Sequence, residues 1–211
     1  TTTDANNGSI IRIHPLTYAF SYIRPFPCAY VNGWLPESNL TEVGGKFYST
    51  TRWGGPALSL PTNFGYGVIY EYDPAGNTYT KKYDFQGGSL GAYAVGYQVK
   101  ANNGKLYGTT FFGTPYTNFP SGTGVLYEYD AVANTYAKKK DFTNSYYLND
   151  IGANGYLWLK AHSGKLYGTT QTGLFEYDVT LDQIRPAGRF NAFNQYPTAL
   201  IEICRKPAYK L

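Results

Sequence analysis

The sequence GKLYGTT at residues 104–110, followed by GVLYEYD at residues 124–130, decides the fold of this chain. Copies of the first phrase begin 59 residues before it and 60 residues after it, as GKFYSTT at residues 45–51 and GKLYGTT at residues 164–170. Copies of the second phrase are GVIYEYD at residues 67–73, GLFEYD at residues 173–178 and the diverged GSIIRIH at residues 8–14. Self-similarity at a nearly constant period of this length indicates a repeat architecture.

Each repeat contains four runs of strand length, which we name a to d in chain order. Run a is a short apolar segment, YQVKA at residues 97–101 in the middle copy, and run b is the GKLYGTT phrase. Run c is the VLYEYD phrase, and run d is NTYTKKYDF at residues 77–85 or NTYAKKKDF at residues 134–142. Tyr, Val, Thr and Phe favour strands, and Asn-Asn-Gly at residues 102–104 and Pro-Ala-Gly-Asn at residues 74–77 predict tight turns. Four short strands per repeat are typical of a β-propeller blade.

We therefore expect an all-β fold, a β-propeller of four-stranded antiparallel blades in a single domain over residues 1–211. The expected parts are a partial blade over residues 1–30, blades over about residues 31–90, 91–145 and 146–192, and closing strands over residues 193–211. Four blades form a ring if the N-terminal strands c and d join C-terminal strands a and b, because this pairing removes two open sheet edges. The alternative is a segment of a larger propeller whose ends meet another chain or further sequence. Since the chain opens on Thr1 and contains no Met, we expect it to be part of a longer protein.

Charged residues recur at fixed places in the repeat. Run d carries Lys81 and Lys82 in one copy and three lysines at residues 138–140 in the next. Because d is the outermost strand of a propeller blade, we expect these lysines to protect an exposed sheet edge from pairing with other chains. We expect the Asp that ends run c to cap the c–d turn, and the Glu two residues before it to pair across the sheet with a Lys of run d.

The composition fits a folded, β-rich chain and excludes several classes of protein. Aromatic residues make up 18% of the chain, with 23 Tyr, and charged residues make up only 15%, which argues against disorder. The formal net charge of +4 is mild and predicts no binding of nucleic acid. No apolar run approaches the ~18 residues that a membrane-spanning helix needs, so we predict no transmembrane segment.

The repeat resembles the GloVer-type tandem repeat, a propeller-forming repeat of secreted bacterial proteins with variable C-terminal anchors. Residues 104–142 match its pattern closely, residues 164–190 match reasonably, and residues 45–85 match with Phe47 for Leu and Ser49 for Gly. The resemblance implies a β-propeller, secretion or cell-surface attachment, and a place in longer proteins in which sorting or adhesion domains follow the repeats. The family has no catalytic residues to transfer, so the resemblance implies neither a reaction nor a ligand.

Reactive side chains form no asymmetric cluster in the sequence. His14 and His162 fall in different runs without a ligand partner at short spacing, so we predict no metal site. The repeated carboxylates would be spread around the ring, whereas glycosidase chemistry needs two unlike carboxylates at one bond. The chain has no nucleophile motif and no phosphate or dinucleotide loop, so we predict no catalytic residue and no cofactor. We also predict no disulfide between Cys28 and Cys204, because the strand ends that carry them belong on opposite faces of the disc.

The loops between runs b and c are the expected binding site, because they vary in length on a fixed frame. The candidate ligand-binding residues are the aromatic residues Trp53, Phe111, Phe112, Tyr116 and Phe119. Their rings suit stacking on sugar faces or packing of the loops themselves. The leading hypothesis is a non-enzymatic, secreted or cell-surface module that binds a glycan or a protein, or acts as a scaffold. One alternative is a polysaccharide lyase or glycosidase with its site at the propeller axis, and another is a structural component that joins other domains or chains of a larger assembly.

Overall fold

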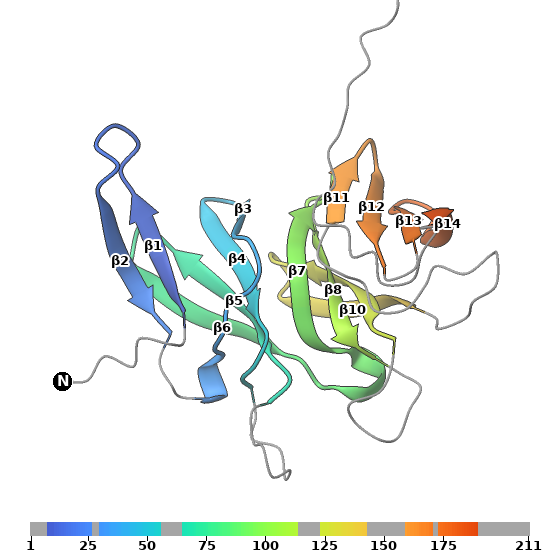
Figure 1. Ribbon diagram of the computed structural model, residues 1–211, viewed down its shortest axis with the longest axis horizontal. Helices are drawn as coiled ribbons and strands as arrows, with labels where there is room; N and C mark the ends of the chain where they lie inside the picture. The colour runs from blue at the N-terminus through green and yellow to red at the C-terminus, as the bar shows by residue number, and fades with distance from the viewer. Residues whose placement is uncertain are drawn as a thin grey trace, which may run out of the picture.

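The computed structural model is built from antiparallel β-sheets (Figure 1). It describes residues 8–26, 30–55, 65–113, 123–142, 159–170 and 173–189. Over these residues the chain forms three four-stranded sheets and one two-stranded hairpin. Two single-turn 3-10 helices, η1 (Tyr30–Asn32) and η2 (Gly88–Leu90), precede the first and second four-stranded sheets. The predicted all-β class with four-stranded antiparallel blades is confirmed.

The strands follow the predicted order a, b, c and d within each blade. The hairpin consists of β1 (Ser9–Ile13) and β2 (Phe20–Pro25). The first blade consists of β3 (Thr41–Val43), β4 (Lys46–Thr51), β5 (Val68–Asp73) and β6 (Thr78–Asp84). The second consists of β7 (Ala92–Lys100), β8 (Leu106–Phe112), β9 (Val125–Asp130) and β10 (Thr135–Asp141). The third consists of β11 (Leu159–His162), β12 (Lys165–Thr169), β13 (Gly173–Asp178) and β14 (Gln183–Arg189).

One strand differs from its predicted extent. The sequence places run a of the second blade at residues 97–101, whereas β7 begins at Ala92. Gly91, just before it, has a φ of 87°, and a Cβ at this position would lie 2.7 Å from the Thr110 side-chain oxygen. Because glycine has no Cβ, the backbone at residue 91 can lie close to β8, and β7 begins at the next residue.

The phenylalanine that ends run d in the hairpin and in the first two blades joins each of these sheets to the next. Its N–H donates to the carbonyl of the glycine before β1, β5 or β9, at distances of 3.1, 3.0 and 3.1 Å for Phe26, Phe85 and Phe142. Its ring then packs against strand c of the following blade. The ring centroids lie 5.2 Å apart for Phe26 and Tyr70, 5.5 Å for Phe85 and Tyr127, and 5.3 Å for Phe142 and Phe175. Edge-on and tilted pairs of this kind are favourable aromatic arrangements.

The tyrosine of run b makes a second junction between blades. The ring centroid of Tyr48 in the first blade lies 6.2 Å from that of Tyr129 in the second, and the centroid of Tyr107 in the second lies 6.0 Å from that of Tyr177 in the third. The hydrophobic core is accordingly divided into three clusters, each between two neighbouring sheets. A four-stranded sheet cannot bury both of its faces alone, so equivalent sheets stack side by side.

The blades form an arc, with the β1–β2 hairpin and the third blade at opposite ends in Figure 1. Within the arc, the inner strand β7 contacts both β3 and β11. In the described residues β1 pairs only with β2, and beside it lies a groove of about 300 Å³ whose lining includes Leu40, Phe47 and Tyr72. The closing strands predicted over residues 193–211 lie outside the described residues, and so do Cys28 and Cys204. Closure of a four-blade ring and the absence of a disulfide therefore stay predictions.

The lysines of run d lie on the outermost strand, as predicted, but they are held in ion pairs and do not stand free at the edge. Their side chains are only 19% to 29% exposed. Lys81 lies 2.9 Å from Asp84, and Lys139 and Lys140 lie 3.6 and 3.4 Å from Asp182 of the next blade. The lysines are therefore partly buried, because Lys81, Lys82 and Lys138 pair with carboxylates of their own blade while Lys139 and Lys140 reach the next one. Their protection of the sheet edge stays a prediction.

Candidate functional site

A Lys–Glu–Tyr cluster recurs on strands b and c of every four-stranded blade. In the first blade, Lys46 Nζ lies 2.8 Å from Glu71 Oε1, and the Tyr48 hydroxyl donates to Glu71 Oε2 at 2.5 Å. The corresponding residues are Lys105, Glu128 and Tyr107 in the second blade and Lys165, Glu176 and Tyr167 in the third. Strand d contributes the predicted lysine in the first blade, where Lys82 lies 3.6 Å from Glu71, and an arginine in the third, where Arg185 lies 2.7 Å from Glu176. The lysine common to all three clusters, however, comes from strand b.

These carboxylates are held in their ionised form. Burial by itself would raise the pKa of Glu71, but hydrogen bonds from Lys46 and Tyr48 and the charge of Lys82 outweigh burial and lower the pKa. The same balance lowers the pKa of Glu128. Burial and the hydrogen bond to Glu71 raise the pKa of Tyr48. An ionised carboxylate that is surrounded by donors and repeated in every blade is suited to holding strands together rather than to transferring protons.

The carboxylate that ends each strand c caps the following turn, as predicted. Asp73 Oδ1 accepts from the Ala75 N–H at 2.9 Å, and the equivalent bonds of Asp130 and Asp178 have lengths of 2.9 to 3.0 Å. His14 takes this place in the hairpin, where its Nδ1 accepts from the N–H groups of Leu16 and Thr17 at 3.3 and 3.2 Å. The repeated Asp and His14 thus have a structural role at the turns.

Three of the five predicted binding residues lie in the described part of the chain, and the Tyr93 ring joins them. Trp53 follows β4, and Phe111 and Phe112 end β8. The Trp53 ring lies 4.2 Å from that of Tyr93, which lies 5.3 Å from Phe112. Phe111 and Phe112 are 4.6 Å apart and nearly perpendicular. The other two predicted residues, Tyr116 and Phe119, lie outside the described residues.

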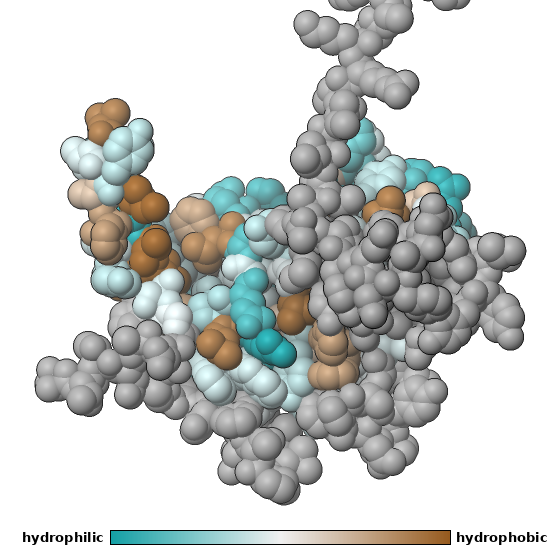
Figure 2. Space-filling view, in the orientation of Figure 1, coloured by the Kyte–Doolittle hydropathy of each residue, from teal (hydrophilic) through white to brown (hydrophobic). Residues whose placement is uncertain are grey.

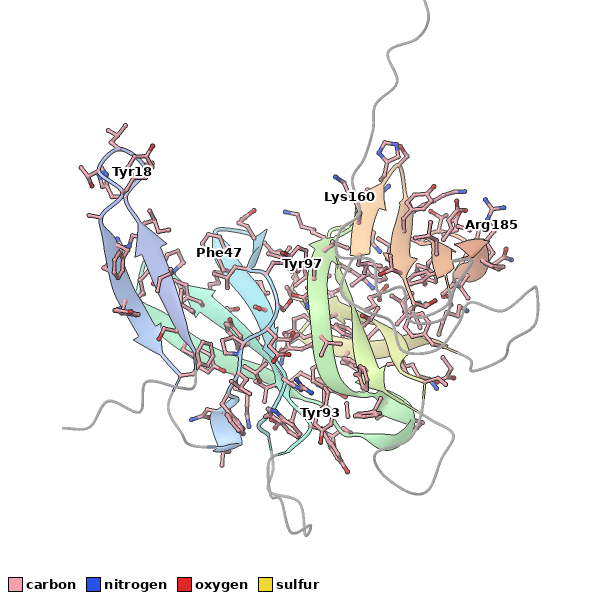
Figure 3. All side chains as sticks on the ribbon, viewed as in Figure 1. Tyr18, Phe47, Tyr93, Tyr97, Lys160 and Arg185 are labelled. Carbon is pink, nitrogen blue, oxygen red and sulfur yellow. The ribbon has the colours of Figure 1, made fainter. Side chains whose placement is uncertain are left out.

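Further aromatic residues extend this group across the junction of the first two blades. Trp34 lies 6.3 Å from Trp53 with the rings 25° from parallel, and Tyr66 lies 6.4 Å from Tyr93. An isolated β-bridge also joins Trp34 and Trp53. We call the six residues the loop-face aromatic cluster, because they lie where the b–c loops leave the blades, close to Tyr93 in Figure 3. Its members are Trp34, Trp53, Tyr66, Tyr93, Phe111 and Phe112.

The loop-face aromatic cluster combines apolar rings with a charged rim. Tyr93 is buried, and burial, reinforced by Tyr66 and opposed by Arg52, raises its pKa to about 12. Trp53 is half-buried and lies under the Arg52 guanidinium, whose carbon is 5.6 Å from the ring centroid. The exposed Arg52 also lies 3.4 Å from Glu37. This arrangement offers flat apolar rings and a cation–carboxylate pair to a ligand.

Sequence reasoning missed Trp34, Tyr66 and Tyr93. Tyr93 has a φ of 55°, and Leu35 at the equivalent place in the first blade has a φ of 54°. Each lies two residues after a glycine, Gly33 or Gly91. A Cβ at either glycine would collide with the buried threonine that ends the GKLYGTT-type phrase. Aligning these Gly-x-x triplets as part of the repeat would have placed Trp34 and Tyr93 at the start of each blade beside the b–c loops.

Other kinds of site find no support in the described residues. These residues contain no group of three or more His, Cys, Asp and Glu side chains placed to hold a metal ion. Nor do they include a helix with the length and apolar character that a bilayer crossing requires. The repeated carboxylates remain in separate blades, each with its own lysine.

Comparison with known structures supports the propeller architecture. TolB from Acinetobacter baumannii matches with a TM-score of 0.51 and 13% identity over 91% of this chain and 40% of that chain. The tricorn protease matches with a TM-score of 0.50 and 13% identity over 89% of this chain and 15% of that chain. At this identity the likeness shows the fold alone, and the chain spans less than half of the length of either protein.

Sequence comparison identifies the repeat itself. No curated protein matches the sequence. A family model described as the Gloeobacter/Verrucomicrobia repeat matches residues 1–202, which include all three GKLYGTT-type phrases. The chain therefore belongs to the Gloeobacter/Verrucomicrobia repeat family, as its repeated phrases predicted.

Proposed function

We propose that this propeller is a non-enzymatic module of a bacterial extracellular or cell-surface protein, and that it binds a glycan through the loop-face aromatic cluster. The observation that carries the proposal lies at the end of the blades that bears the variable loops. There the Tyr93 ring centroid is 4.2 Å from that of Trp53 and 5.3 Å from that of Phe112. Loops on a rigid scaffold are where binding residues usually lie.

The chemistry of the cluster suits a carbohydrate. Trp and Tyr rings combine an apolar face with a polar tip, so they can cover the C–H face of a sugar while bonding to its hydroxyl groups. Arg52 and Glu37, 3.4 Å apart at the rim, add a donor and an acceptor for sugar hydroxyls. Half-buried rings that are already packed against one another also lose little conformational entropy when a ligand binds.

The inner strands support a binding role over an enzymatic one. An enzyme at the axis would need acidic groups or other reactive side chains that break the repeat and converge. Glu42 is the one carboxylate of β3, β7 and β11, and it accepts from the Gly45 N–H at 2.6 Å and pairs with Lys100 at 3.6 Å. A lyase or glycosidase at the axis remains the alternative that the experiment must test.

A glycan array followed by titration of the best polysaccharide tests the proposal. Trp53 and Trp34 report binding by intrinsic fluorescence, because both belong to the cluster. Trp53→Ala and Phe112→Ala should weaken binding at least about tenfold, which corresponds to about 1.4 kcal/mol. Leu181→Ala serves as the control, because Leu181 is 64% exposed on a c–d turn away from the b–c loops.

The outcomes separate the hypotheses. No binding by the wild type, or equal binding by the wild type and both aromatic variants, refutes the loop-face site. Release of new reducing ends or unsaturated sugars during the titration refutes the non-enzymatic role and supports the enzymatic alternative. Circular dichroism of each variant shows whether a loss of binding is merely a loss of fold.

A further inference from the structure

The β1–β2 hairpin is the outer half of a blade, so each of its residues has a counterpart in the complete blades. The Phe26 N–H bonds to the Gly8 carbonyl just as Phe85 bonds to Gly67. Both strand pairs also shift register at the same place, between Ile10 and Ile11 and between residues 69 and 70. By this register Ile11 and Ile13 correspond to residues 70 and 72 of the first blade.

In the part of the chain that the structure describes, no sheet covers one face of the hairpin, whereas the counterparts of its residues are covered. Tyr70 and Tyr72 are 2% and 3% exposed because the preceding sheet lies on them, whereas Ile11 and Ile13 are 49% and 56% exposed. Their neighbours on β2 and on the turn are more exposed still, with Phe20 at 64%, Tyr22 at 71% and Tyr18 at 79%. Figure 2 shows the hydrophobic colour along this hairpin at the upper left, and Figure 3 labels Tyr18 at its tip. We call this set of residues the leading face. It consists of Ile11, Ile13, Tyr18, Phe20 and Tyr22.

The third blade carries the opposite half of the same junction. In the first two blades, the residues that pack on the following blade include Tyr48 and Tyr107 on strand b, and Ile69 and Leu126 on strand c, all of them buried. Their counterparts in the third blade are Tyr167 and Leu174, which are only half-buried. Leu174 pairs across the sheet with Gly188, and we call Tyr167, Leu174, Ala187 and Gly188 the trailing face.

The two faces differ from the internal junctions in a complementary way. Between the second and third blades, Lys139 and Lys140 of strand d bind Asp182 of the c–d turn. On the trailing face, the lysine positions hold Ala187 and Gly188 by the register of β13 and β14. On the leading face, the position of Asp182 holds Tyr18, with a φ of 55° against 52° for Asp182. An ion pair is thus replaced by an aromatic ring on one face and small residues on the other.

A second position shows the same exchange. Tyr83 of the first blade stacks on Tyr136 of the second, with centroids 4.2 Å apart and planes 5° from parallel. The counterpart of Tyr136 on the leading face is Phe20, and the counterpart of Tyr83 on the trailing face is Gly188. Among the described residues, the atom nearest to a Cβ at Gly188 belongs to Leu174 and lies 3.6 Å away, which leaves room for the Phe20 ring. Large exposed rings on one end therefore match small residues on the other.

We propose that the leading face of one copy of this chain binds the trailing face of a second copy, as a head-to-tail continuation of the blade-to-blade junction. The two faces stand at opposite ends of the arc that the described residues form in Figure 1. An interface between two different patches of the same chain either closes into a ring of copies or runs on as a filament. This interaction is independent of any ligand at the loop face.

Complementary variants test the proposal on the 211-residue chain. Sedimentation velocity across a dilution series should show the wild type associating. Phe20→Lys destroys the leading face and Gly188→Arg fills the trailing face, so each variant alone should be monomeric. Each variant keeps one intact face, and an equal mixture of the two should therefore form a one-to-one complex and nothing larger. Val132→Lys, at a residue that is 92% exposed on the c–d turn of the middle blade, should associate like the wild type.

Other outcomes overturn the proposal. A wild type that stays monomeric throughout the series shows that a second copy does not cover these faces. Association that survives Gly188→Arg but not Phe20→Lys, without restoration in the mixture, shows that two hairpins pair with each other. Both variants are checked for wild-type circular dichroism, and since both substituted positions are exposed, we expect them to fold.

Discussion

Phe85→Ala tests whether the junction between blades holds the propeller together. Phe85 is fully buried, and its ring centroid lies 5.5 Å from Tyr127, 5.8 Å from Tyr136 and 5.7 Å from Tyr83. The substitution removes an entire aromatic ring and leaves a cavity between two sheets that cannot collapse without shifting a blade. Losses of about 3–5 kcal/mol are usual for such a change in a core. The free energy of unfolding of a domain is about 5–15 kcal/mol in total, so the variant should be severely destabilised.

Urea unfolding, followed by far-ultraviolet circular dichroism and by tryptophan fluorescence, measures the effect. Phe85→Leu should lose less than half as much, because leucine refills most of the volume. Phe142→Ala should lose about as much as Phe85→Ala, since it occupies the equivalent junction and is 1% exposed. Leu181→Ala, at an exposed turn, should change the stability by less than about 0.5 kcal/mol. A loss below about 1 kcal/mol for Phe85→Ala would refute the view that this ring anchors neighbouring blades.

Three further changes test the cluster, the turns and the strand starts. The pKa of Glu128 is lower in the folded chain than its ordinary 4.5, so its contribution to stability is present above pH 4.5 and is lost as the pH falls through the folded pKa. Glu128→Gln should therefore flatten the decline of the melting temperature in acid. An unchanged slope would contradict a stabilising role of the Lys–Glu–Tyr cluster. Asp130→Ala removes the acceptor of two turn N–H groups at 3.0 and 2.9 Å and should cost about 1 kcal/mol in thermal unfolding, with most of it restored by Asn. Gly91→Ala, at a φ of 87° and with a Cβ 2.7 Å from its neighbours, should lower the free energy of unfolding by more than about 2 kcal/mol. Gly88→Ala, at a φ of 52° in open space, should lower it by about 1 kcal/mol. Equal losses in urea unfolding would argue against the close approach of Gly91 to β8.

Much of the fold could be predicted because its signals are local and repeated. The alternating residues of runs b, c and d recur at nearly the same spacing, so one interpretation had to fit every copy. The Asp at the end of run c caps its turn through N–H groups two and three residues away, a contact that short-range rules describe. The early start of β7 at Ala92 was not predicted, because it depends on the approach of Gly91 to a strand that follows later in the chain.

The candidate site was only partly predictable. Trp53, Phe111 and Phe112 could be chosen from the variable b–c loops. Tyr93, whose ring lies between those of Trp53 and Phe112, is indicated only when the Gly-x-x triplets of different repeats are aligned. The lysines of run d were expected at a free edge, and the structure instead pairs Lys139 and Lys140 with Asp182 of another blade. These contacts join residues of different repeats, so no single repeat contains the information.

The amino-acid sequence alone determined the strands, their order within a blade and the equivalence of the blades, because hydrophobic alternation and turn residues act over a few positions. Only the tertiary structure decided which groups meet between blades, such as the Phe85 ring on Tyr127 and the loop-face aromatic cluster around Tyr93, and which rings of the hairpin stay exposed. The physical reason is that packing between sheets depends on shape and distance in three dimensions. A pattern of residues along the chain specifies which face a side chain occupies, and the neighbouring blade determines what that side chain touches.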